Sequence, residues 1–545
     1  MTTSPEADPT VDAVIIGAGF AGMYALRRFR DELGLDVRVF ERASDVGGTW
    51  FWNRYPGARC DVESMYYSYS FSEELEQEWD WTERYATQPE ILAYANHVAD
   101  RFALRETITF DTSVDSAEFD ESENTWVVRT DTGETVRARF LISAVGCLSS
   151  SRVPDIAGSA DFTGELLHTG RWPHDGADLA GKRVAVIGTG SSGVQAIPEI
   201  ARTAGHLTVF QRTPHFVIPA GNRPLAPAHV ANIKSDYQTL REECRHSYGG
   251  TIVELPIGSA LEFDESARRA EMDRRWSVGG TDVMATFTDT SVNLDANTIL
   301  ADYAREQILA YVDEPELAAH LTPRDYPIGA KRICLGTDYY TTFNRENVTL
   351  VDVRDTPITR LTQAGIVAGE QEYEFDVIVF ATGYDAMTGA VLAIDIKGVG
   401  GESLRDAWAA GPRTLLGLST AGFPNLFFIT GPGSPSVLVN VIVSIEQHVD
   451  WIHDLIAHVA RNDIARVEAQ PQAQDDWVDH VNERSKRSFL TKVANWYQGA
   501  NVPGKPRVFM PYVGGMGPYR QSCDEVAAAG YAGFTLTPAL QSAPA

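Results

Sequence analysis

The sequence predicts an α/β protein with two Rossmann-like dinucleotide-binding domains and a helical insertion in the second domain. Two observations predict this fold class. A strand, a glycine turn and a helix follow one another twice, and each copy leads into a second apolar strand. The length of 545 residues agrees with several domains, because a single hydrophobic core stops growing at about 250–300 residues.

The first copy is the segment VDAVIIGAGFAGMYALRRFRDELG, in which a buried strand at 13–16 precedes the glycine turn. Gly17, Gly19 and Gly22 have the GxGxxG spacing, which allows a tight turn, a close approach of pyrophosphate to the backbone and close packing of the helix on the strand. The next strand, DVRVFE, ends at Glu41, whose carboxylate can accept hydrogen bonds from ribose hydroxyls. The segment therefore predicts a dinucleotide site.

The second copy, KRVAVIGTGSSGVQAI, has the same spacing at Gly188, Gly190 and Gly193. Its next strand, HLTVFQR, ends at Arg212, and Thr213 follows. The repeat predicts a second dinucleotide site on the same chain.

One position distinguishes the ligands of the two sites. Glu41 lies 24 residues after Gly17 (41 minus 17), and Arg212 lies 24 residues after Gly188 (212 minus 188). An acid at this position repels a 2′-phosphate, whereas an arginine followed by a threonine can bind one. We therefore expect FAD in the first site and NADPH in the second.

Further segments suggest the domain organisation. Two apolar strands at 138–147 and 375–385 each run into a glycine, and we expect both to return the chain to the domain junction. The segments HVANIKSDYQTLREECRHS and LADYAREQILAYV have helical periodicity. The expected limits are 1–147 for the first part of the FAD-binding domain, 148–384 for the NADPH-binding domain with its helical insertion at about 225–327, and 385–545 for the second part of the FAD-binding domain.

The composition argues against several classes of function. A formal net charge of −28 disfavours binding to nucleic acid or to an anionic membrane, since both need an electropositive face. The cysteines are scattered, without a CxxC pair or metal-ligand spacing, so we expect free thiols in a reducing cytosol, no metal site and no disulfide-reductase chemistry. They are Cys60, Cys147, Cys244, Cys334 and Cys523.

The amino-terminal segment MTTSPEADPTVD lacks the apolar core of a signal peptide, which predicts a cytoplasmic protein. The uncharged stretch from Thr414 to Ile445 is long enough to span a bilayer, but its three prolines and four glycines argue against a spanning helix. We expect buried strand and loop there.

The stretch FTGELLHTGRWP at 162–173, ahead of the second glycine turn, is more specific. It resembles the FxGxxxHxxxW[P/D] fingerprint of the type I Baeyer–Villiger monooxygenases, and each specified position matches. These positions are Phe162, Gly164, His168, Trp172 and Pro173. Four other segments also look like that family: DVGGTWFWNRYPGARCD, IGAKRICLGTDYYTTFNRENV, GFPNLFFITGPGSPS and NWYQGANVPGKPRVFMPYVGG. The last two are most similar to its phenylacetone monooxygenase branch.

The resemblance implies a flavin monooxygenase that uses NADPH and inserts one O2-derived oxygen next to a ketone carbonyl, giving an ester or lactone. NADPH would reduce FAD, O2 would add at flavin C4a, and the deprotonated peroxide would attack the carbonyl. The expected partners are a small apolar ketone and O2, with no obligate protein partner. His168 would lie in a linker that sets how the cofactors face each other. Without the flanking motifs, a packed core histidine would be the simpler interpretation.

The resemblance also implies roles for three charged residues. Arg332 in AKRICLG aligns with the catalytic arginine, which would stabilise the peroxyflavin because a guanidinium stays protonated in a dry pocket. Asp61 matches the carboxylate that orients this arginine beside FAD, and Lys331 aligns with a residue that contacts the NADP phosphate.

Three further segments are expected to contact a cofactor or the substrate. Gly47, Gly48, Thr49 and Trp50 should lie along FAD, and Trp496, in a glycine-rich segment, matches the residue that closes over NADP⁺. The loop of Ser436, Val437 and Leu438 should lie beside the flavin and line the substrate pocket, without a charge to pair with an acid or amine.

Other flavin chemistry stays open at this point. An N- or S-oxygenating flavin monooxygenase would use the protonated hydroperoxide, which needs no arginine to keep it anionic. An uncoupled NADPH oxidase would release hydrogen peroxide, and an inactive protein would only bind the cofactors. Arg332 and the complete fingerprint favour ketone oxidation.

Overall fold

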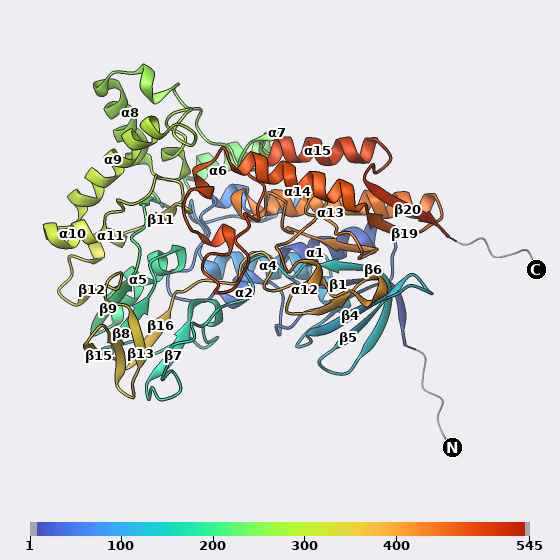
Figure 1. Cartoon of the computed structure of the whole chain (residues 1–545). Helices are drawn as coiled ribbons and strands as arrows, with labels where there is room; N and C mark the ends of the chain where they lie inside the picture. The colour runs from blue at the N-terminus through green and yellow to red at the C-terminus, as the bar shows by residue number, and fades with distance from the viewer. Residues whose placement is uncertain (1–7, 540–545) are drawn as a thin grey trace, which may run out of the picture.

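The computed structural model describes residues 8–539, which form two lobes, each built around parallel strands (Figure 1). In this view the strands of the first sheet lie at the lower right and those of the second sheet at the lower left. Helices of the insertion extend above the second sheet, and the long carboxyl-terminal helices lie above the first.

The first sheet has eight strands in the order β17-β4-β5-β6-β1-β2-β3, with β18 beside β6. The pairs β1–β2, β2–β3, β1–β6 and β6–β18 are parallel, whereas β4, β5 and β6 form an antiparallel meander. The strands β17 and β18 follow residue 385, so the late part of the chain completes the first sheet; the exact domain limits stay predictions. The bounds are β1 Thr10–Ile16, β2 Val37–Phe40, β3 Ile108–Thr109, β4 Val114–Asp120, β5 Thr125–Thr130, β6 Thr135–Ser143, β17 Asp395–Lys397 and β18 Leu426–Phe428.

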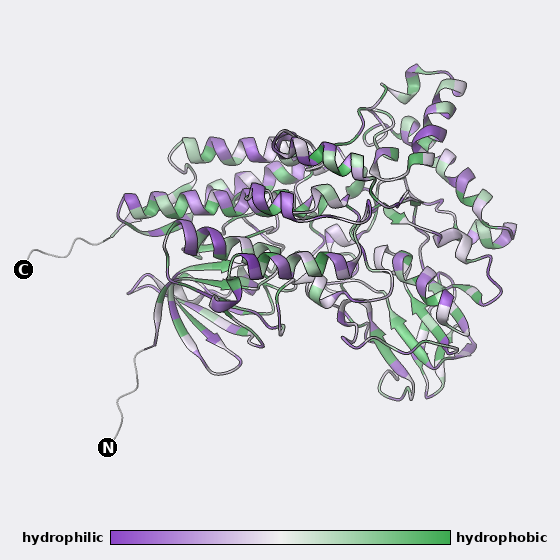
Figure 2. Ribbon diagram, turned by 180° about the vertical axis from the view of Figure 1, so that it is seen from behind, coloured by the Kyte–Doolittle hydropathy of each residue, from purple (hydrophilic) through white to green (hydrophobic). Residues whose placement is uncertain are grey.

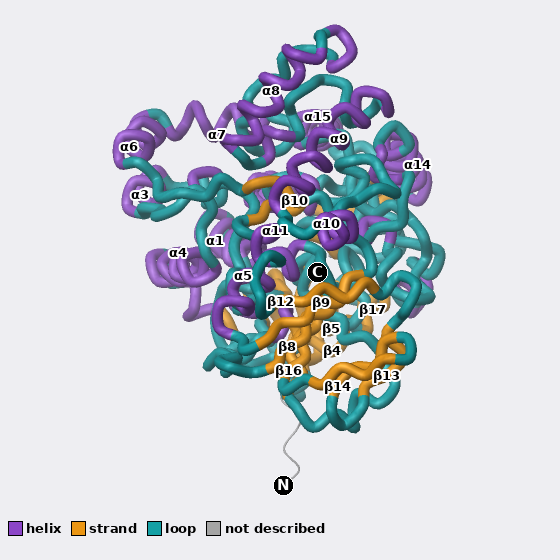
Figure 3. Tube along the Cα trace, turned by 90° about the vertical axis from the view of Figure 1, so that its left-hand side faces the viewer, coloured by secondary structure: helices purple, strands orange, loops and turns teal. Residues whose placement is uncertain are grey.

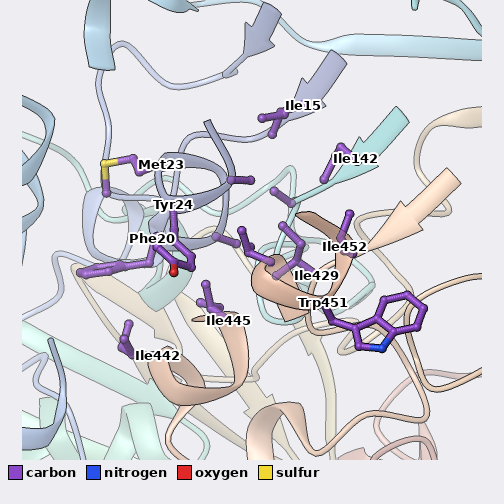
Figure 4. Close-up of a cluster of buried hydrophobic side chains, with 14 of the residues drawn as sticks. Ile15, Phe20, Met23, Tyr24, Ile142, Ile429, Ile442, Ile445, Trp451 and Ile452 are labelled. Atoms are coloured by element: carbon purple, nitrogen blue, oxygen red, sulfur yellow. The ribbon is translucent and has the colours of Figure 1, made fainter. Parts of the chain in front are cut away.

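Strand β1 is buried on both faces, which explains its continuous apolar run. Ile15 lies in one core cluster and Val14 in another, on opposite sides of the sheet. The helices α1 (Phe20–Arg27) and α13 (Val441–Arg461) pack together over the first cluster, where Ile15 and Ile142 lie near Ile452 (Figure 4). The first glycine turn is thus held between a buried strand and a packed helix.

The second sheet has five parallel strands in the order β12-β9-β8-β16-β7, and Figure 3 labels the first four of them. This order corresponds strand for strand to β3-β2-β1-β6-β18 in the first sheet. The predicted pair of Rossmann-like units is therefore confirmed. The bounds are β7 Glu165–His168, β8 Arg183–Ile187, β9 His206–Gln211, β12 Val348–Asp352 and β16 Val377–Phe380, with α5 Ser191–Thr203 after the glycine turn.

Shorter elements surround the two sheets. A three-stranded antiparallel sheet joins β13 (Ile358–Leu361), β14 (Gly365–Ala368) and β15 (Gln371–Glu374), and two pairs join β10 (Val217–Pro219) with β11 (Cys334–Gly336) and β19 (Ile464–Ala469) with β20 (Phe534–Pro538). The other helices outside the insertion are α2 Thr49–Trp52, α3 Glu73–Glu78, α4 Gln88–Arg101, α11 Tyr339–Thr342, α12 Leu404–Ala407, α14 Pro471–Ser485 and α15 Met516–Ala528.

The insertion is helical, as expected, but it contacts both lobes. The backbone turns at Asp236 (φ −147°, ψ 52°), whose side chain caps the next helix by accepting from the Thr239 N–H. Tyr237 joins the core of the first lobe, whereas Trp276 and Leu300 join that of the second. The later helices thus pack on the second lobe, while the assignment of the whole insertion to the NADPH domain stays a prediction. The helices are α6 Pro227–Ser235, α7 Tyr237–His246, α8 Glu265–Val278, α9 Leu294–Tyr311 and α10 Pro315–Leu321.

Two segments connect the lobes and run side by side. Ser151 forms a bridge with Tyr384, the Arg152 N–H donates to the Gly383 carbonyl at 3.2 Å, and the Asp385 N–H donates to the Ser150 carbonyl at 2.9 Å. The expected return of both apolar strands to the junction is confirmed.

The hydropathy of the chain follows this arrangement (Figure 2). Strands of the second sheet are mainly hydrophobic, whereas the strands of the first sheet and the helices mix hydrophobic and hydrophilic residues. The uncharged stretch ending at Ile445 contains β18 and a buried loop, as expected, but its last five residues already belong to α13. Across residues 8–539, no helix combines the length and the apolar composition needed to cross a membrane.

Candidate active site

The first glycine turn lies at the carboxyl end of β1, where two loops meet. Gly17 has a φ of 102°, and a Cβ there would lie 2.7 Å from the Ala144 carbonyl oxygen. A Cβ on Gly22 would lie 1.8 Å from the Gly17 carbonyl oxygen, so both positions require glycine. Gly19 and Gly48 pack against each other, since a Cβ on Gly48 would lie 2.9 Å from the Gly19 Cα. The two loops expected to bind FAD therefore form one continuous backbone surface.

The rest of the expected FAD segment continues from this surface into α2. Gly47 precedes the helix, and its N–H donates to the Ala18 carbonyl at 3.2 Å. Thr49 begins α2, and the Trp50 indole donates to the Tyr67 hydroxyl at 3.1 Å. The structure thus brings Gly47 and Gly48 to the first glycine turn, and Thr49 and Trp50 follow them directly in α2.

Glu41 lies beside the same turn, at the end of β2. Its carboxylate accepts hydrogen bonds from the Ala18 N–H at 2.6 Å and the Ala43 N–H at 2.8 Å. Burial raises the pKa of this carboxyl, although the backbone hydrogen bonds oppose the shift. Each carboxylate oxygen keeps a second acceptor site, so Glu41 can hold the loop and still accept a ribose hydroxyl.

The second glycine turn repeats this geometry at the end of β8. Gly188 has a φ of 111°, and its Cβ would lie 2.5 Å from the Ala381 carbonyl oxygen. A Cβ on Gly193 would lie 2.2 Å from the Gly188 carbonyl oxygen. At Gly190, apart from its chain neighbours, no heavy atom of residues 8–539 lies within 4 Å of the Cβ position, and no side chain in this range caps the start of α5. This open backbone at a helix N-terminus fits a pyrophosphate.

The cations expected at the 2′-phosphate lie beside the second turn. Arg212 is exposed at the end of β9, and the carbonyl of Thr213 accepts from the Thr189 hydroxyl at 3.1 Å. Burial and the nearby charge of Arg212 lower the pKa of Lys331, whose ammonium donates to the Ala494 carbonyl at 2.7 Å. Two cations held near each other fit a ligand with several negative charges.

Arg332 and Asp61 form an ion pair across 271 residues of sequence. Arg332 Nη2 and Nε donate to Asp61 Oδ2 at 2.6 and 3.2 Å, and Nη1 donates to the Val437 carbonyl at 2.8 Å. The negative charge of Asp61 is the main cause that raises the pKa of Arg332, which keeps the guanidinium charged. The side chains retain 30% and 26% exposure, so the pair borders accessible space.

Three parts of the chain meet at this ion pair. Asp61 follows α2 in the first lobe, Arg332 precedes β11 in the second lobe, and Val437 lies in the loop after β18. The catalytic pair expected from the sequence is therefore at the junction of the two lobes.

The expected substrate loop and Trp496 belong to one apolar cluster. Val437 and Tyr497 are buried in it, and Leu438 and Trp496 are partly buried against it. Ser436 is also buried, with its hydroxyl 3.9 Å from the Met387 sulfur. Sequence reasoning missed Tyr497, although it directly follows Trp496 in the same family-like segment.

The fingerprint segment was expected to be a linker, but part of it belongs to the second sheet. Residues 165–168 form β7, the edge strand of the second sheet, because their backbone pairs with β16. Gly164 precedes the strand, and a Cβ there would lie 2.4 Å from the Asp376 carbonyl oxygen. Phe162 and Trp172 are buried in two clusters of the second lobe.

His168 ends β7 and contacts a segment that connects the lobes. Its Nδ1 accepts from the Gly170 N–H at 2.9 Å, so Nε2 carries the hydrogen and faces the Arg152 carbonyl at 3.1 Å. Burial lowers the pKa of His168 to about 4. The imidazole is therefore neutral near pH 7 and ties the second sheet to the junction, while its effect on the cofactors stays a prediction.

The thiols of the chain are free. Cys60, Cys147 and Cys334 lie near Arg332, but burial raises the pKa of each thiol and keeps it protonated. Within residues 8–539, no cluster of His, Cys, Asp and Glu side chains could hold a metal ion.

Comparisons with known proteins agree with this arrangement. A family model described as pyridine nucleotide-disulphide oxidoreductase matches residues 14–239. A Baeyer–Villiger monooxygenase from Pseudooceanicola batsensis is 43% identical over 527 residues, covering 95% of each chain. A phenazine N-monooxygenase from Lysobacter antibioticus is 42% identical over 96% of this chain and 97% of its own.

Among solved structures, a steroid monooxygenase bound to NADP superposes with a TM-score of 0.92. It is 52% identical, and the match covers 97% of this chain and all of the other. With relatives this similar over nearly its full length, the chain belongs to the Baeyer–Villiger monooxygenases, flavoenzymes that use FAD and NADPH to convert ketones into esters or lactones.

Proposed function

We propose that Arg332, oriented by Asp61, provides the fixed positive charge in the oxidation of a neutral, mainly apolar ketone. The observation that carries this proposal is the ion pair at the junction of the lobes, where Arg332 is also held by the Val437 carbonyl. Negative charge develops on the ketone oxygen during the reaction, and a preorganised cation stabilises that charge most where water is excluded. Asp61 holds the guanidinium in place and keeps its pKa high.

The cofactors would bind at the two glycine turns. The FAD residues would be Gly17, Gly19, Gly22, Glu41, Gly47, Gly48, Thr49, Trp50 and Asp61. The NADPH residues would be Gly188, Gly190, Gly193, Arg212, Thr213, Lys331 and Trp496. When bound, FAD reduced by NADPH would supply the activation of O2. These residues would bind the cofactors, orient them and exclude water.

The substrate would enter beside Ser436, Val437 and Leu438. Their apolar cluster also includes Phe509 and Met510, so the surface offered to a substrate is mainly apolar. An apolar ketone would be stabilised by burial against this surface, whereas a charged group would lose its hydration there. The relative named for a steroid supports an apolar substrate, and a panel of ketones that differ in size and charge, with product identification, tests the class.

The first prediction separates the role of Arg332 from cofactor reduction. Arg332→Ala should retain FAD and its reduction by NADPH, because hydride transfer builds no oxyanion, while ester formation falls by at least about 10²–10³-fold. Arg332→Lys restores the charge without the planar fork and should rescue little activity. Stopped-flow reduction without oxygen, combined with product analysis in air, measures both steps. Near wild-type ester formation by the alanine variant would place the catalytic cation elsewhere.

N-oxygenation of an aromatic heterocycle is a second candidate because one relative is a phenazine N-monooxygenase, although the relatives as a whole do not favour it. Arg332 favours ketone oxidation, since N-oxygenation needs no partner for a carbonyl oxyanion. Adding phenazine to the ketone panel distinguishes the two. N-oxide formation with no ester from any ketone would favour the second candidate.

A further inference from the structure

Asn440 is buried, lies just after the substrate loop (residues 436–438) and caps the start of α13. Its Oδ1 atom accepts from the Ile442 N–H at 3.1 Å, which satisfies one of the free N–H groups at the helix start. Its amide nitrogen donates to the Tyr66 carbonyl at 2.8 Å and to the Gly250 carbonyl at 3.3 Å. A cap needs only the oxygen, so the two bonds of the nitrogen serve another purpose.

The partners of this amide nitrogen belong to different parts of the molecule. Tyr66 packs against the core of the first lobe, and its carbonyl also accepts from Arg241 of α7 at 3.2 Å. Gly250 follows α7 in the insertion, and the backbone N–H of Asn440 donates to the neighbouring Gly249 carbonyl at 2.8 Å. Asn440 therefore joins the end of the substrate loop both to the first lobe and to the insertion.

The insertion approaches Asn440 closely and is itself fixed at this point. Gly250 has a φ of 69°, and a Cβ there would lie 3.1 Å from the Asn440 Cβ, so the approach suits glycine. The Tyr248 hydroxyl donates to the Val513 carbonyl at 2.6 Å, and the Tyr248 carbonyl accepts from the Met516 N–H at 2.9 Å. Asn440 thus binds to a supported part of the insertion.

The backbone of the substrate loop needs support from its surroundings. Ser436 has a φ of 43°, a left-handed conformation that is unfavourable for a residue with a Cβ and persists where neighbouring contacts enforce it. Before the loop, the Gly433 N–H donates to the Met510 carbonyl at 2.7 Å. After the loop, the hydrogen bonds of Asn440 hold the chain. The loop is therefore held at both ends.

We propose that Asn440 is a positioning residue, which sets where the substrate loop lies relative to the insertion and thereby which ketones the enzyme accepts. Leu438, which packs against the apolar cluster, is only two residues away. Without the amide nitrogen, the end of the loop loses its side-chain bonds to Tyr66 and Gly250, and Leu438 is placed less firmly. A less firmly placed side chain discriminates less between ketones of different size.

The test keeps the cap and removes the amide nitrogen. Serine caps a helix about as well as asparagine, but in Asn440→Ser the shorter side chain loses the bonds to the Tyr66 and Gly250 carbonyls. The ratio of kcat/KM for the two ketones that the wild type distinguishes most should move towards one by roughly three- to ten-fold, mainly through KM, as expected for one lost hydrogen bond. FAD content and anaerobic flavin reduction should not change.

The matched control is Asn293→Ser. Asn293 caps α9 in the same way, because its Oδ1 atom accepts from the Asp295 N–H at 2.9 Å and the Ala296 N–H at 3.3 Å. This variant changes a cap of the same kind away from the substrate loop. It should keep the wild-type ratio for the two ketones.

A second variant disturbs the same contact from the side of the insertion. Gly250→Ala places a methyl group against Asn440 and should move the ratio for the two ketones in the same direction. Gly400→Ala is its control, because Gly400 has a similar φ of 66° and, apart from its chain neighbours, no heavy atom of residues 8–539 lies within 4 Å of its Cβ position. That control should keep the wild-type ratio.

A further readout does not depend on turnover. In the FAD-loaded resting enzyme, backbone amides of residues 436–440 should exchange hydrogen for deuterium faster in Asn440→Ser than in the wild type or in Asn293→Ser, as measured by peptide mass spectrometry. A wild-type ketone ratio or wild-type exchange in Asn440→Ser would overturn the proposal. Equal changes in Asn293→Ser, or loss of FAD from Asn440→Ser together with a wild-type ratio in Gly250→Ala, would assign the amide to folding and also overturn it.

The proposal rests on the proposed place of the substrate beside residues 436–438, and the two can fail separately. Unchanged ketone selectivity in Leu438→Ala would refute the place of the substrate. Changed selectivity in Leu438→Ala together with wild-type selectivity in Asn440→Ser would refute the role of Asn440 alone.

Discussion

At the scale of single residues, two corresponding positions differ in charge and in surroundings. The carboxylate of Glu41 is buried and bound to two backbone N–H groups of the first turn. Arg212, at the corresponding position of the second turn, is exposed and near Lys331. The first arrangement suits ribose hydroxyls, and the second suits a phosphate that approaches from solvent.

Arg212→Ala should weaken NADPH binding by roughly ten- to a hundred-fold and NADH binding much less, because a charge-assisted hydrogen bond contributes about 1.5–3 kcal/mol. The measurement is the KM for each coenzyme in flavin reduction. Arg202→Ala, which removes an exposed arginine near the end of α5, is the control. Equal effects of Arg212→Ala on both coenzymes would contradict the assignment.

At the scale of elements, the loop after β18 combines two functions on neighbouring residues. Val437 contacts Arg332 through its backbone carbonyl, whereas Leu438 contributes its side chain to the apolar cluster. Shortening the loop would disturb both functions. A side-chain substitution at Leu438 isolates the substrate pocket.

Leu438→Ala should change which ketones are accepted, because the shorter side chain leaves more space for a substrate beside the apolar cluster without moving the Val437 carbonyl. The ratio of kcat/KM for a bulky and a small ketone should rise roughly tenfold, the size expected when pocket volume changes by a few methylene groups. Anaerobic flavin reduction should not change. Leu309→Ala, on the exposed face of α9, serves as the control. A Leu438→Ala enzyme that differed from the wild type only in flavin reduction would exclude Leu438 from the pocket.

At the scale of the whole molecule, the paired connecting segments hold the two lobes together. His168 contributes the imidazole that links the second sheet to Arg152 in one of these segments. The hydrogen bonds of His168 require a neutral ring, since protonated Nδ1 would face the Gly170 N–H. Acid should therefore weaken this contact.

The pKa of His168 is lowered to about 4 in the folded chain, against about 6.5 in an unfolded one. Between these values the unfolded chain binds a proton that the folded chain does not, so the free energy of unfolding falls as the pH falls from about 6.5 towards 4. One such group lowers the free energy of unfolding by about 2 kcal/mol between pH 7 and pH 5.

His168→Asn should therefore lower the thermal midpoint at pH 7 and flatten its decrease between pH 7 and pH 5. His215 and His448 also have lowered pKa values, and they contribute equally in the wild type and in His168→Asn. The measurement therefore compares how steeply the thermal midpoint falls with pH in the two proteins. The exposed His246, replaced by Asn, provides the control. An unchanged slope in His168→Asn would contradict the neutral-ring assignment.

The sequence alone determined both Rossmann-like units, their cofactors and the family. These depend on local patterns: GxGxxG spacing, a charge at a fixed distance from the turn, and the fingerprint around His168. Each pattern specifies a short stretch of backbone or one contact with a ligand, so it is visible without knowledge of distant contacts.

Only the tertiary structure decided how residues far apart in sequence meet. Asp61, Arg332, Val437 and Tyr497 come from four separate segments, and no local periodicity links them. Arg332 bonds to Asp61 and to the Val437 carbonyl, and Val437 packs in one cluster with Tyr497; family resemblance suggested the first three residues and missed the last. Residues 165–168 of the fingerprint segment form an edge strand because their backbone pairs with β16, about 200 residues later in the chain. Pairing between strands and contacts with a half-buried charge depend on the packing of the whole chain, which a short sequence pattern does not contain.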